Sequence, residues 1–221
     1  MNNTRQLALG WIMYAGDNND RTPGLLDNGG YTGTITDWSS NWCGGLMSTL
    51  QSCTNTLSLT AGQIFPYVKN VAVYHCPADI TTQHFVGAQG GLALRVRSYS
   101  MSETFGQGEF LPASRYKTYT KLGAIVHPDQ TWVFIGEAAN SINDAAFAVQ
   151  MTVPGSYLGY EIDIPSGRHD GAVGITFADG HSIIHKWMSS LTYKDTGHQT
   201  IHDAAFVTDM VWLSSVSSVA K

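Results

Sequence analysis

The fold class is decided by the stretch AVGITFADGHSIIHKW, residues 172–187. Two runs rich in β-branched and aromatic residues flank the dipeptide Asp179-Gly180. Asp-Gly between such runs is the strongest short-range signal for a β-hairpin, because a type I′ turn needs positive φ at both central residues. We therefore predict an antiparallel hairpin over residues 172–187 with a two-residue turn.

Three further segments in the neighbouring sequence have the pattern of strands. Residues 131–135 form a continuous apolar run that begins shortly after Pro128, which is typical of a buried strand. Residues 97–101 and 147–153 alternate in polarity, as half-buried strands do. These segments and the hairpin predict a small antiparallel sheet within residues 128–187, joined by the strand at 97–101.

Helical signals lie at the two ends of the chain. Residues 3–17 place Leu7, Trp11 and Ala15 at helical spacing, and a Gly-Asp-Asn-Asn-Asp run then ends the pattern. Asp203 is a predicted N-cap for a helix over 203–215. Between the first helix and the sheet, residues 21–60 are expected to form a long loop, followed by a helical turn at 64–68, a short β-run at 71–74 and a loop at 81–93. The prediction is a single α+β domain over residues 1–221.

The composition excludes some partners. Charged residues make up 13% of the chain and the formal net charge is −5. The densest basic cluster, Arg95-Val96-Arg97, holds two charges, whereas nucleic-acid binding needs a basic stripe, so nucleic acid is not expected as a partner. No apolar run approaches the roughly 20 residues that span a bilayer, and the first residues have no signal-peptide pattern.

The three cysteines leave two interpretations open. Cys43 and Cys53 bracket a short Gly- and Ser-containing loop and would close a disulfide in an oxidising compartment, which leaves Cys76 unpaired. The alternative is three reduced, partly buried thiols.

Several short elements together resemble one protein family. The elements are Asn2-Asn3-Thr4-Arg5-Gln6-Leu7, then Val73-Tyr74-His75-Cys76-Pro77-Ala78-Asp79, then Arg97-Ser98-Tyr99-Ser100-Met101, then Arg168-His169 followed after nine residues by Asp179-Gly180, and finally Asp209-Met210-Val211-Trp212-Leu213. In this order they resemble the pilin-like pseudopilins of type II secretion-like systems in Planctomycetes and Verrucomicrobia. The family-motif residues on this chain are Cys76, Pro77, Asp79, His169, Asp179 and Gly180.

The resemblance implies the fold and the function of a pilin-like head. Residues 1–18 would be the remnant of a pilin helix whose basic leader, cleavage site and hydrophobic half are missing, and Cys76 would have lost its disulfide partner with them. The implied function is a structural subunit that assembles with other pseudopilins and with secretion machinery. The full-length protein would be extracytoplasmic, anchored in the inner membrane only through the missing helix.

Two groups of side chains are candidates for metal binding. His169, Asp179 and His181 surround the hairpin and are ligand types that suit zinc. However, His169 lies about eight residues before the turn, on the order of 25 Å away if the strand is extended, so these residues fit a fold element better than a metal centre. Glu137, Asp144 and Asp163 are oxygen ligands of the kind that suit Ca²⁺, and the resemblance also implies a calcium ion in a head loop.

Two other functions remain open as alternatives. One is a metal- or calcium-dependent hydrolase (esterase, lactonase or glycosidase) built on the same scaffold, although no nucleophile elbow is present, and an enzyme is the less favoured interpretation. The other is a carbohydrate- or protein-binding module that would use aromatic residues in loops. These are Trp38, Trp42, Tyr116, Tyr119, Tyr157 and Tyr160.

Overall fold

A computed structural model describes residues 2–25, 38–85, 91–106, 111, 115–151, 162–194 and 203–221 of the chain. Its α-helices are α1 (Asn2–Asp17), α2 (Leu50–Cys53), α3 (Leu57–Thr60), α4 (Phe65–Val68) and α5 (Ala204–Ser215). Short 3-10 helices occur at η2 (Trp38–Ser40), η3 (Val71–Tyr74), η4 (Glu103–Phe105), η5 (Leu122–Ala124) and η6 (Ser190–Thr192). The strands are β1 (Thr82–Phe85), β2 (Gly91–Leu94), β3 (Tyr99–Ser102), β4 (Trp132–Gly136), β5 (Ala146–Phe147), β6 (Ala172–Phe177) and β7 (Ser182–Lys186).

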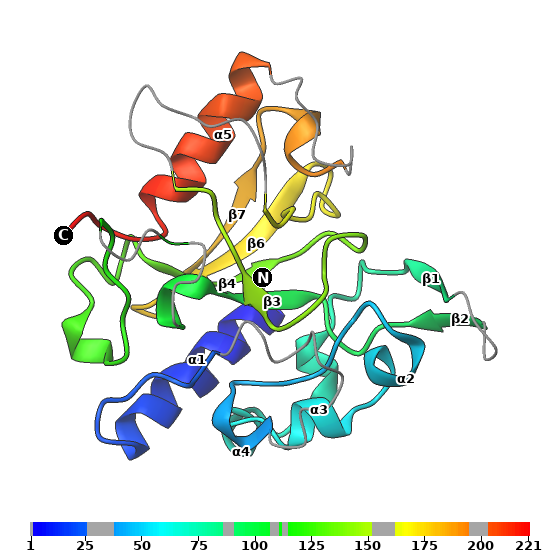
Figure 1. The fold of residues 1–221 in the computed structure, drawn as a ribbon, viewed down its shortest axis with the longest axis horizontal. Helices are drawn as coiled ribbons and strands as arrows, with labels where there is room; N and C mark the ends of the chain where they lie inside the picture. Colours follow the sequence, from blue (N-terminus) through cyan, green and yellow to red (C-terminus); the bar gives the residue numbers. More distant parts are fainter. Residues whose placement is uncertain are drawn as a thin grey trace.

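The described strands form a five-stranded sheet with the order β5-β3-β4-β6-β7 and a separate two-stranded ribbon of β1 and β2. All neighbours in the larger sheet are antiparallel except β3 and β5, which run parallel. The ribbon projects from the body of the molecule (Figure 1). The predicted α+β class is confirmed, and so is the mainly antiparallel sheet.

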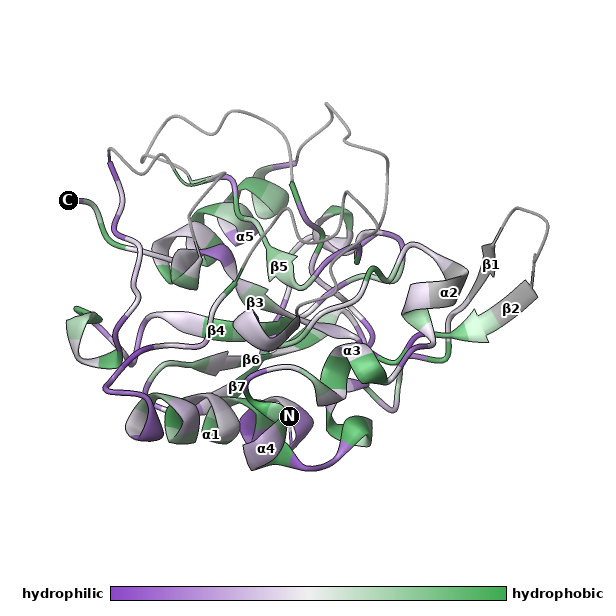
Figure 2. Cartoon of the chain, turned by 60° about the horizontal axis from the view of Figure 1, so that its bottom comes forward, coloured by the Kyte–Doolittle hydropathy of each residue, from purple (hydrophilic) through white to green (hydrophobic). Residues whose placement is uncertain are grey.

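Helix α1 covers one face of the sheet and packs on β4 and β6 (Figures 1 and 2). Its predicted apolar side is buried, with Leu7 and Trp11 fully inaccessible. Gly10 faces α4: a Cβ atom at this position would lie 2.7 Å from Val68 Cγ2, so the absence of a side chain lets the two helices approach closely. The helix therefore forms because one of its faces is part of the core.

Helix α5 covers the opposite face of the sheet, as Figure 2 shows. Asp203 has the extended backbone of an N-cap, and its Oδ1 accepts a hydrogen bond of 2.6 Å from the Phe206 amide, so the predicted cap is confirmed. Phe206 and Leu213 pack with Trp132 and Ile175 in a second core. The sheet thus lies between two apolar layers.

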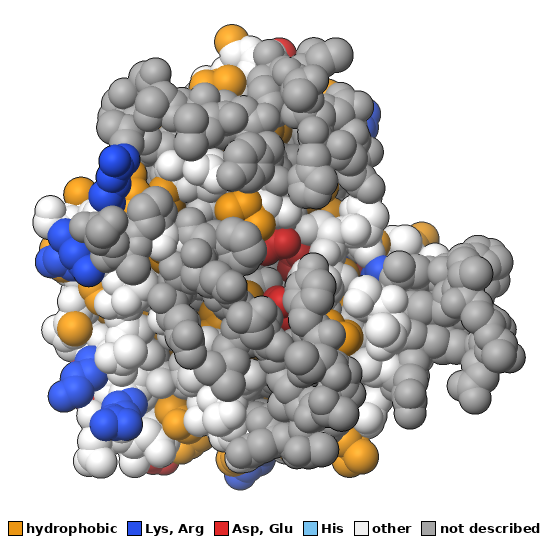
Figure 3. Space-filling view, viewed as in Figure 1, with side chains coloured by type: hydrophobic (Ala, Val, Ile, Leu, Met, Phe, Trp, Pro, Cys, Tyr) orange, Lys and Arg blue, Asp and Glu red, His pale blue; other side chains and the backbone are white. Residues whose placement is uncertain are grey.

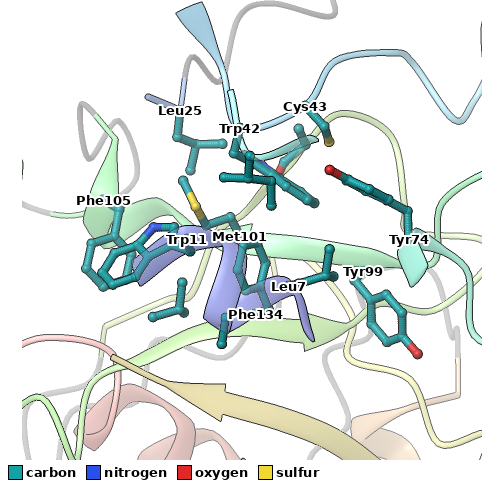
Figure 4. Close-up of a cluster of buried hydrophobic side chains, with 14 of the residues drawn as sticks. Leu7, Trp11, Leu25, Trp42, Cys43, Tyr74, Tyr99, Met101, Phe105 and Phe134 are labelled. Atoms are coloured by element: carbon teal, nitrogen blue, oxygen red, sulfur yellow. The ribbon is translucent and has the colours of Figure 1, made fainter. Parts of the chain in front are cut away.

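The loop that follows α1 is tied into the first core by Trp42 (Figure 4). Its ring packs edge-to-face on Phe134 with centroids 4.9 Å apart, and it stacks on Tyr74 at 5.9 Å. The indole Nε1 donates a 3.0 Å hydrogen bond to the Ala145 carbonyl. The Trp42 ring is therefore a core element, as is Tyr119, and neither is an exposed binding platform.

The predicted hairpin over 172–187 is confirmed, but its turn type was predicted wrongly. The Phe177 amide donates to the His181 carbonyl and the Gly180 amide donates to the Phe177 carbonyl, which leaves a three-residue loop. Only Gly180 has positive φ, at 90°, and Asp179 does not. The connection is therefore a type I turn followed by a glycine bulge, the second common class of short hairpin loop.

Two other local predictions were wrong. The expected β-run at 71–74 is the 3-10 helix η3, because the Asn70 side chain accepts a hydrogen bond from the Ala72 amide and turns the chain. The expected loop at 81–93 contains the ribbon of β1 and β2. Of the strand expected at 147–153, only Phe147 is in a strand, at the end of β5; residues 148–151 are not in a strand, and residues 152 and 153 lie outside the described part of the chain.

All three cysteines are buried and none of them is in a disulfide, so the predicted Cys43–Cys53 disulfide is not formed. Cys43 belongs to the core around Trp42, whereas Cys53 packs in a separate small cluster with Met47 and Ile142. Burial raises the pKa of the Cys43 thiol to about 12. The structure matches the alternative of three reduced thiols.

Candidate functional site

Three segments that are far apart in the sequence meet in a polar cluster beside the first turn of α1. We call it the 79/168 cluster; it is made up of His75, Cys76, Asp79, Ser98, Tyr99, Arg168 and His169. The first three follow η3. Ser98 immediately precedes β3 and Tyr99 is its first residue, whereas Arg168 and His169 lie in the turn that leads into β6. The sequence elements singled out above, Cys76 to Asp79 and Arg168-His169, therefore lie side by side in the fold.

An ion pair forms the centre of the cluster. Arg168 Nη2 lies 3.0 Å from Asp79 Oδ2, and their side chains are 11% and 3% exposed. The same carboxylate oxygen accepts a 2.6 Å hydrogen bond from Ser98 Oγ. A carboxylate this deeply buried is stable only with such partners, because burying an unpaired charge costs several kcal/mol.

A thiol and an imidazole meet next to the ion pair. Cys76 Sγ lies 3.5 Å from His169 Nε2. Burial raises the pKa of the neighbouring Tyr99, and the Cys76 thiol raises it further. Burial lowers the pKa of His169, and the nearby positive charge of Arg168 lowers it further. Burial likewise lowers the pKa of His75. Both imidazoles are therefore held toward the neutral form at neutral pH.

The cluster connects the N-terminal helix to the sheet. Asn3 Nδ2 on α1 donates a 2.8 Å hydrogen bond to the His75 carbonyl. The Ser98 amide donates to the Tyr74 carbonyl at 2.9 Å, and the Asp79 amide closes a turn on the Cys76 carbonyl at 2.8 Å. The arrangement fixes where α1 begins to cross the sheet.

A second polar network surrounds Glu137, the first residue after β4. Glu137 is fully buried; its Oε1 accepts a 2.8 Å hydrogen bond from Ser141 Oγ, and its Oε2 accepts one from Ser100 Oγ. Ser141 Oγ in turn accepts from the Ile164 amide at 2.8 Å. Burial, reinforced by the neighbouring Asp163 carboxylate, raises the pKa of Glu137 well above its ordinary value.

Arg97 links this network to the first core. Its Nη1 donates to the Tyr99 carbonyl at 2.7 Å and to Ser100 Oγ at 2.9 Å, and its Nη2 donates to the Asp144 carbonyl. The guanidinium also lies over the Trp42 ring, 5.9 Å from its centroid.

On the face shown in Figure 3, acidic side chains reach the surface near the centre, whereas Lys and Arg lie mainly along one margin.

The predicted metal ligands fall in separate places. Asp179 and His181 lie at the hairpin turn, with His181 Nδ1 2.6 Å from Asp179 Oδ1 and the His181 ring stacked on Phe177. His169 lies at the other end of β6, in the 79/168 cluster, so the structure does not bring the three together. Among the described residues, no group of three or more His, Cys, Asp and Glu side chains is arranged to hold a metal ion.

Two of the three acidic candidates, Glu137 and Asp163, are neighbours. Asp163 acts electrostatically on Glu137, and its Oδ2 accepts a 2.7 Å hydrogen bond from the Ala148 amide. Asp144 Oδ1 accepts from the Ala146 amide at 2.9 Å. These carboxylates are thus engaged in holding the segments around β5. Calcium binding stays a prediction.

Sequence reasoning missed the partners of the motif residues. Ser98 and Arg168 were noted only as parts of longer elements, and the Cys76–His169 contact spans 93 positions of sequence. Sequence reasoning treats Arg95 and Arg97 as a small basic cluster, and Arg97 also as part of a longer element, but does not predict that both are buried. The one sequence signal that could have suggested buried ion pairs is the presence of arginines inside β-rich segments of a chain with few charged residues.

Comparisons with protein-family models, with curated proteins and with solved structures find no match to this chain. Among the described residues, no helix combines the length and apolar character needed to cross a membrane. The candidate site is therefore defined by its geometry alone: a buried ion pair with a thiol–imidazole contact, positioned at the junction of α1, β3 and β6.

Proposed function

We propose that this chain is the head of a pilin-like assembly subunit, a pseudopilin, whose function is structural and not catalytic. In the full-length gene product, a hydrophobic segment continuous with α1 would anchor the subunit in the inner membrane, and the head would lie outside the cytoplasm. Its partners would be other pilin-like subunits and the secretion machinery. The proposal rests on the sequence resemblance together with the exposed side of α1.

The observation that carries the proposal is the distribution of apolar residues around α1. Leu7 and Trp11 are fully buried against the sheet, whereas Leu9 and Met13 on the outer side are 47% and 54% exposed. These two residues are four positions apart and form one apolar stripe on the helix surface. An apolar stripe directed away from the core is a surface that an assembly of helices would bury.

The 79/168 cluster supports a structural function for the motif residues. Cys76, Asp79, Arg168 and His169 contact one another and brace the first turn of α1 through Asn3. A subunit that transmits force from a helix to its head needs this junction to be rigid. The same residues would be poor catalysts, since the Asp79 carboxylate is engaged by Arg168 and Ser98 and is 3% exposed.

The test uses the full coding sequence, including the part upstream of Met1, expressed in bacteria with a prepilin peptidase. We expect the protein to be shortened by the peptidase and to enter the membrane fraction. Leu9→Cys and Met13→Cys should form cross-links between copies there. The matched control is Leu57→Cys, which is 64% exposed on α3 and should not cross-link.

Two outcomes would overturn the proposal. One is a protein that is neither processed nor found in membranes. The other is cross-linking at Leu57 as efficient as at Leu9, because it would mean random collision of copies and no preferred use of the α1 stripe.

A further inference from the structure

Helix α5 meets the outer strand β7 through a stack of aromatic rings. The His185 imidazole lies flat on the Trp212 indole, with ring centroids 3.5 Å apart and ring planes 5° from parallel. Trp187 closes the stack from the side, its centroid 4.6 Å from that of His185 and 6.0 Å from that of Trp212. Trp187 is 4% exposed and its Nε1 donates a 3.1 Å hydrogen bond to the Ser166 carbonyl, so this side of the stack is fixed. His185 is therefore part of the contact that holds the last turn of α5 on the sheet.

One edge of the His185 imidazole suits only the neutral ring. Its Nε2 atom is buried and has no hydrogen-bond partner among the described residues. A neutral imidazole with its hydrogen on Nδ1 presents a lone pair at Nε2, whereas the protonated ring presents a second N–H donor there. A buried donor without an acceptor and a positive charge withdrawn from water both disfavour the protonated ring. Proton binding at His185 is therefore opposed for as long as α5 covers this ring.

One acidic side chain of α5 acts on this imidazole. Asp209 is the single titratable side chain in the sequence of α5, and the sequence of β6, which pairs with β7, has none. Asp209 is 2% exposed and accepts hydrogen bonds of 3.0 Å from the Met188 and Ser189 amides and of 2.7 Å from the Thr192 hydroxyl. These donors already compensate its charge. Burial accordingly lowers the pKa of His185, and the opposing attraction of Asp209 is the smaller effect.

We propose that the contact between His185 and Trp212 is a proton-sensitive switch, which holds α5 on β7 at neutral pH and loosens it in mildly acidic conditions. Because folding lowers the pKa of His185, the neutral ring contributes stability that is fully present above the ordinary value of 6.5. This contribution is lost as the pH falls below 6.5 and through the pKa of the folded state. The other charge on this strand, Lys186, is 62% exposed and paired with Asp170. Helix α5 lies across the sheet from α1, so this inference goes beyond the proposed function and does not rest on it.

The expected loosening begins at the C-terminal end of α5. Asp203 caps the first turn of the helix, and Asp209 in the middle holds the segment that follows β7. Trp212 lies in the last turn, where the ring stack is the contact with β7. A proton on His185 would therefore free the last turn before the rest of the helix, as a local opening and not as unfolding of the whole chain.

The first experiment measures hydrogen–deuterium exchange of the 221-residue chain between pH 7.5 and 5.5, resolved by residue and corrected for the intrinsic pH dependence of exchange. We expect the last turn of α5 to open more as the pH falls below 6.5, by at most about tenfold per pH unit, which is the limit for one proton. The amides of α1, on the opposite face of the sheet, should show no such increase. His185→Phe keeps a flat ring on Trp212 but takes up no proton, so its opening should not depend on pH. His127→Phe replaces an exposed histidine and is the matched control, which should keep the pH dependence of the parent.

The second experiment uses the unaltered protein and follows the His185 ring by NMR, with its signals assigned through their contacts with the Trp212 ring. We expect the ring to be half-protonated only below pH 6.5, and half-protonation at or above 6.5 overturns the proposal. Opening of α5 that stays constant or decreases on acidification also overturns it, and a decrease would mean that attraction of the protonated ring to the indole face is the larger effect. So does an equal pH dependence in His185→Phe, or an increase of the same size in α1, which would mean a general loss of stability in acid. None of these results depends on whether the pilin-like function holds.

Discussion

Replacing Asp79 with asparagine should destabilise the protein strongly, although the change is nearly isosteric. The new amide side chain would retain an oxygen that can accept from Ser98 Oγ, so the substitution removes the charge and little else. It leaves the Arg168 guanidinium, 11% exposed, without the carboxylate that lies 3.0 Å from its Nη2. The loss is therefore the cost of an uncompensated charge in a buried site.

The expected magnitude is about 3–5 kcal/mol of unfolding free energy, the range for removing one partner of a buried ion pair. Removing both charges in Asp79→Asn/Arg168→Met should cost less than either single change, because no unpaired charge remains. A double-mutant cycle therefore separates the pairing from the packing. The matched control is Asp170→Asn, which breaks an exposed pair with Lys186 and should leave stability unchanged.

The measurement is equilibrium unfolding in urea, followed by tryptophan fluorescence and circular dichroism, with the m-value checked for constancy. If Asp79→Asn costs no more than Asp170→Asn, the ion pair does not hold the cluster together. If the double variant loses the sum of the two single losses, the two residues act independently and the reasoning from their contact is refuted.

Four other predictions concern the core, the thiols and the acidic residues. Leu7→Ala should cost about 2–5 kcal/mol in urea unfolding, and Leu9→Ala, on the exposed side of α1, far less; equal losses would contradict the one-sided burial of the helix. Folding raises the pKa of the Glu137 carboxyl group above its ordinary value of 4.5. The protonated carboxyl group therefore contributes to stability below pH 4.5, and this contribution is lost as the pH rises through the pKa of the folded state. Glu137→Gln should therefore gain stability relative to the parent as pH rises, and a constant difference would contradict this. Ellman's reagent should detect three thiols in protein that is denatured without a reductant, and it should react only slowly with the native protein. Detection of a single thiol in the denatured protein would instead indicate a disulfide. Calcium bound by Glu137, Asp144 and Asp163 would raise the melting temperature over that in EDTA by mass action, and identical curves would exclude it.

The elements that sequence patterns predicted best are those whose signal is local. The N-cap at Asp203, the hairpin around Asp179-Gly180 and the one-sided pattern of α1 each depend on residues within a few positions of one another. The turn type was wrong because Asp-Gly fits two hairpin loops, and the choice between them lies in one φ angle at Asp179. The strand predicted at residues 71–74, where the structure has the 3-10 helix η3, was wrong for a similar reason. A run of four apolar residues does not distinguish a strand from a helical turn.

The 79/168 cluster could not be predicted from local patterns. Asp79 and Arg168 are 89 positions apart (168 − 79), and nothing in either segment specifies the other as its partner. Distances along an extended strand correctly separated His169 from the Asp179–His181 pair, because a strand has a fixed rise per residue. The same reasoning does not show which distant segment a residue meets, since that depends on how the strands are ordered in the sheet.

The position of the 79/168 cluster fits the mechanical function proposed above. Both the ion pair and the Cys76–His169 contact join the segment after η3 to the segment before β6, and Asn3 attaches α1 to the first of these. A force applied along α1 would thus be carried into the sheet through buried contacts, of which the Asp79–Arg168 pair is charge-assisted and therefore the strongest. A catalytic site would require the opposite property, a reactive group with an open approach. On this argument, Asp79 and Arg168 are expected to affect stability and assembly together, and the α1 stripe should lose cross-linking in any variant that loosens them.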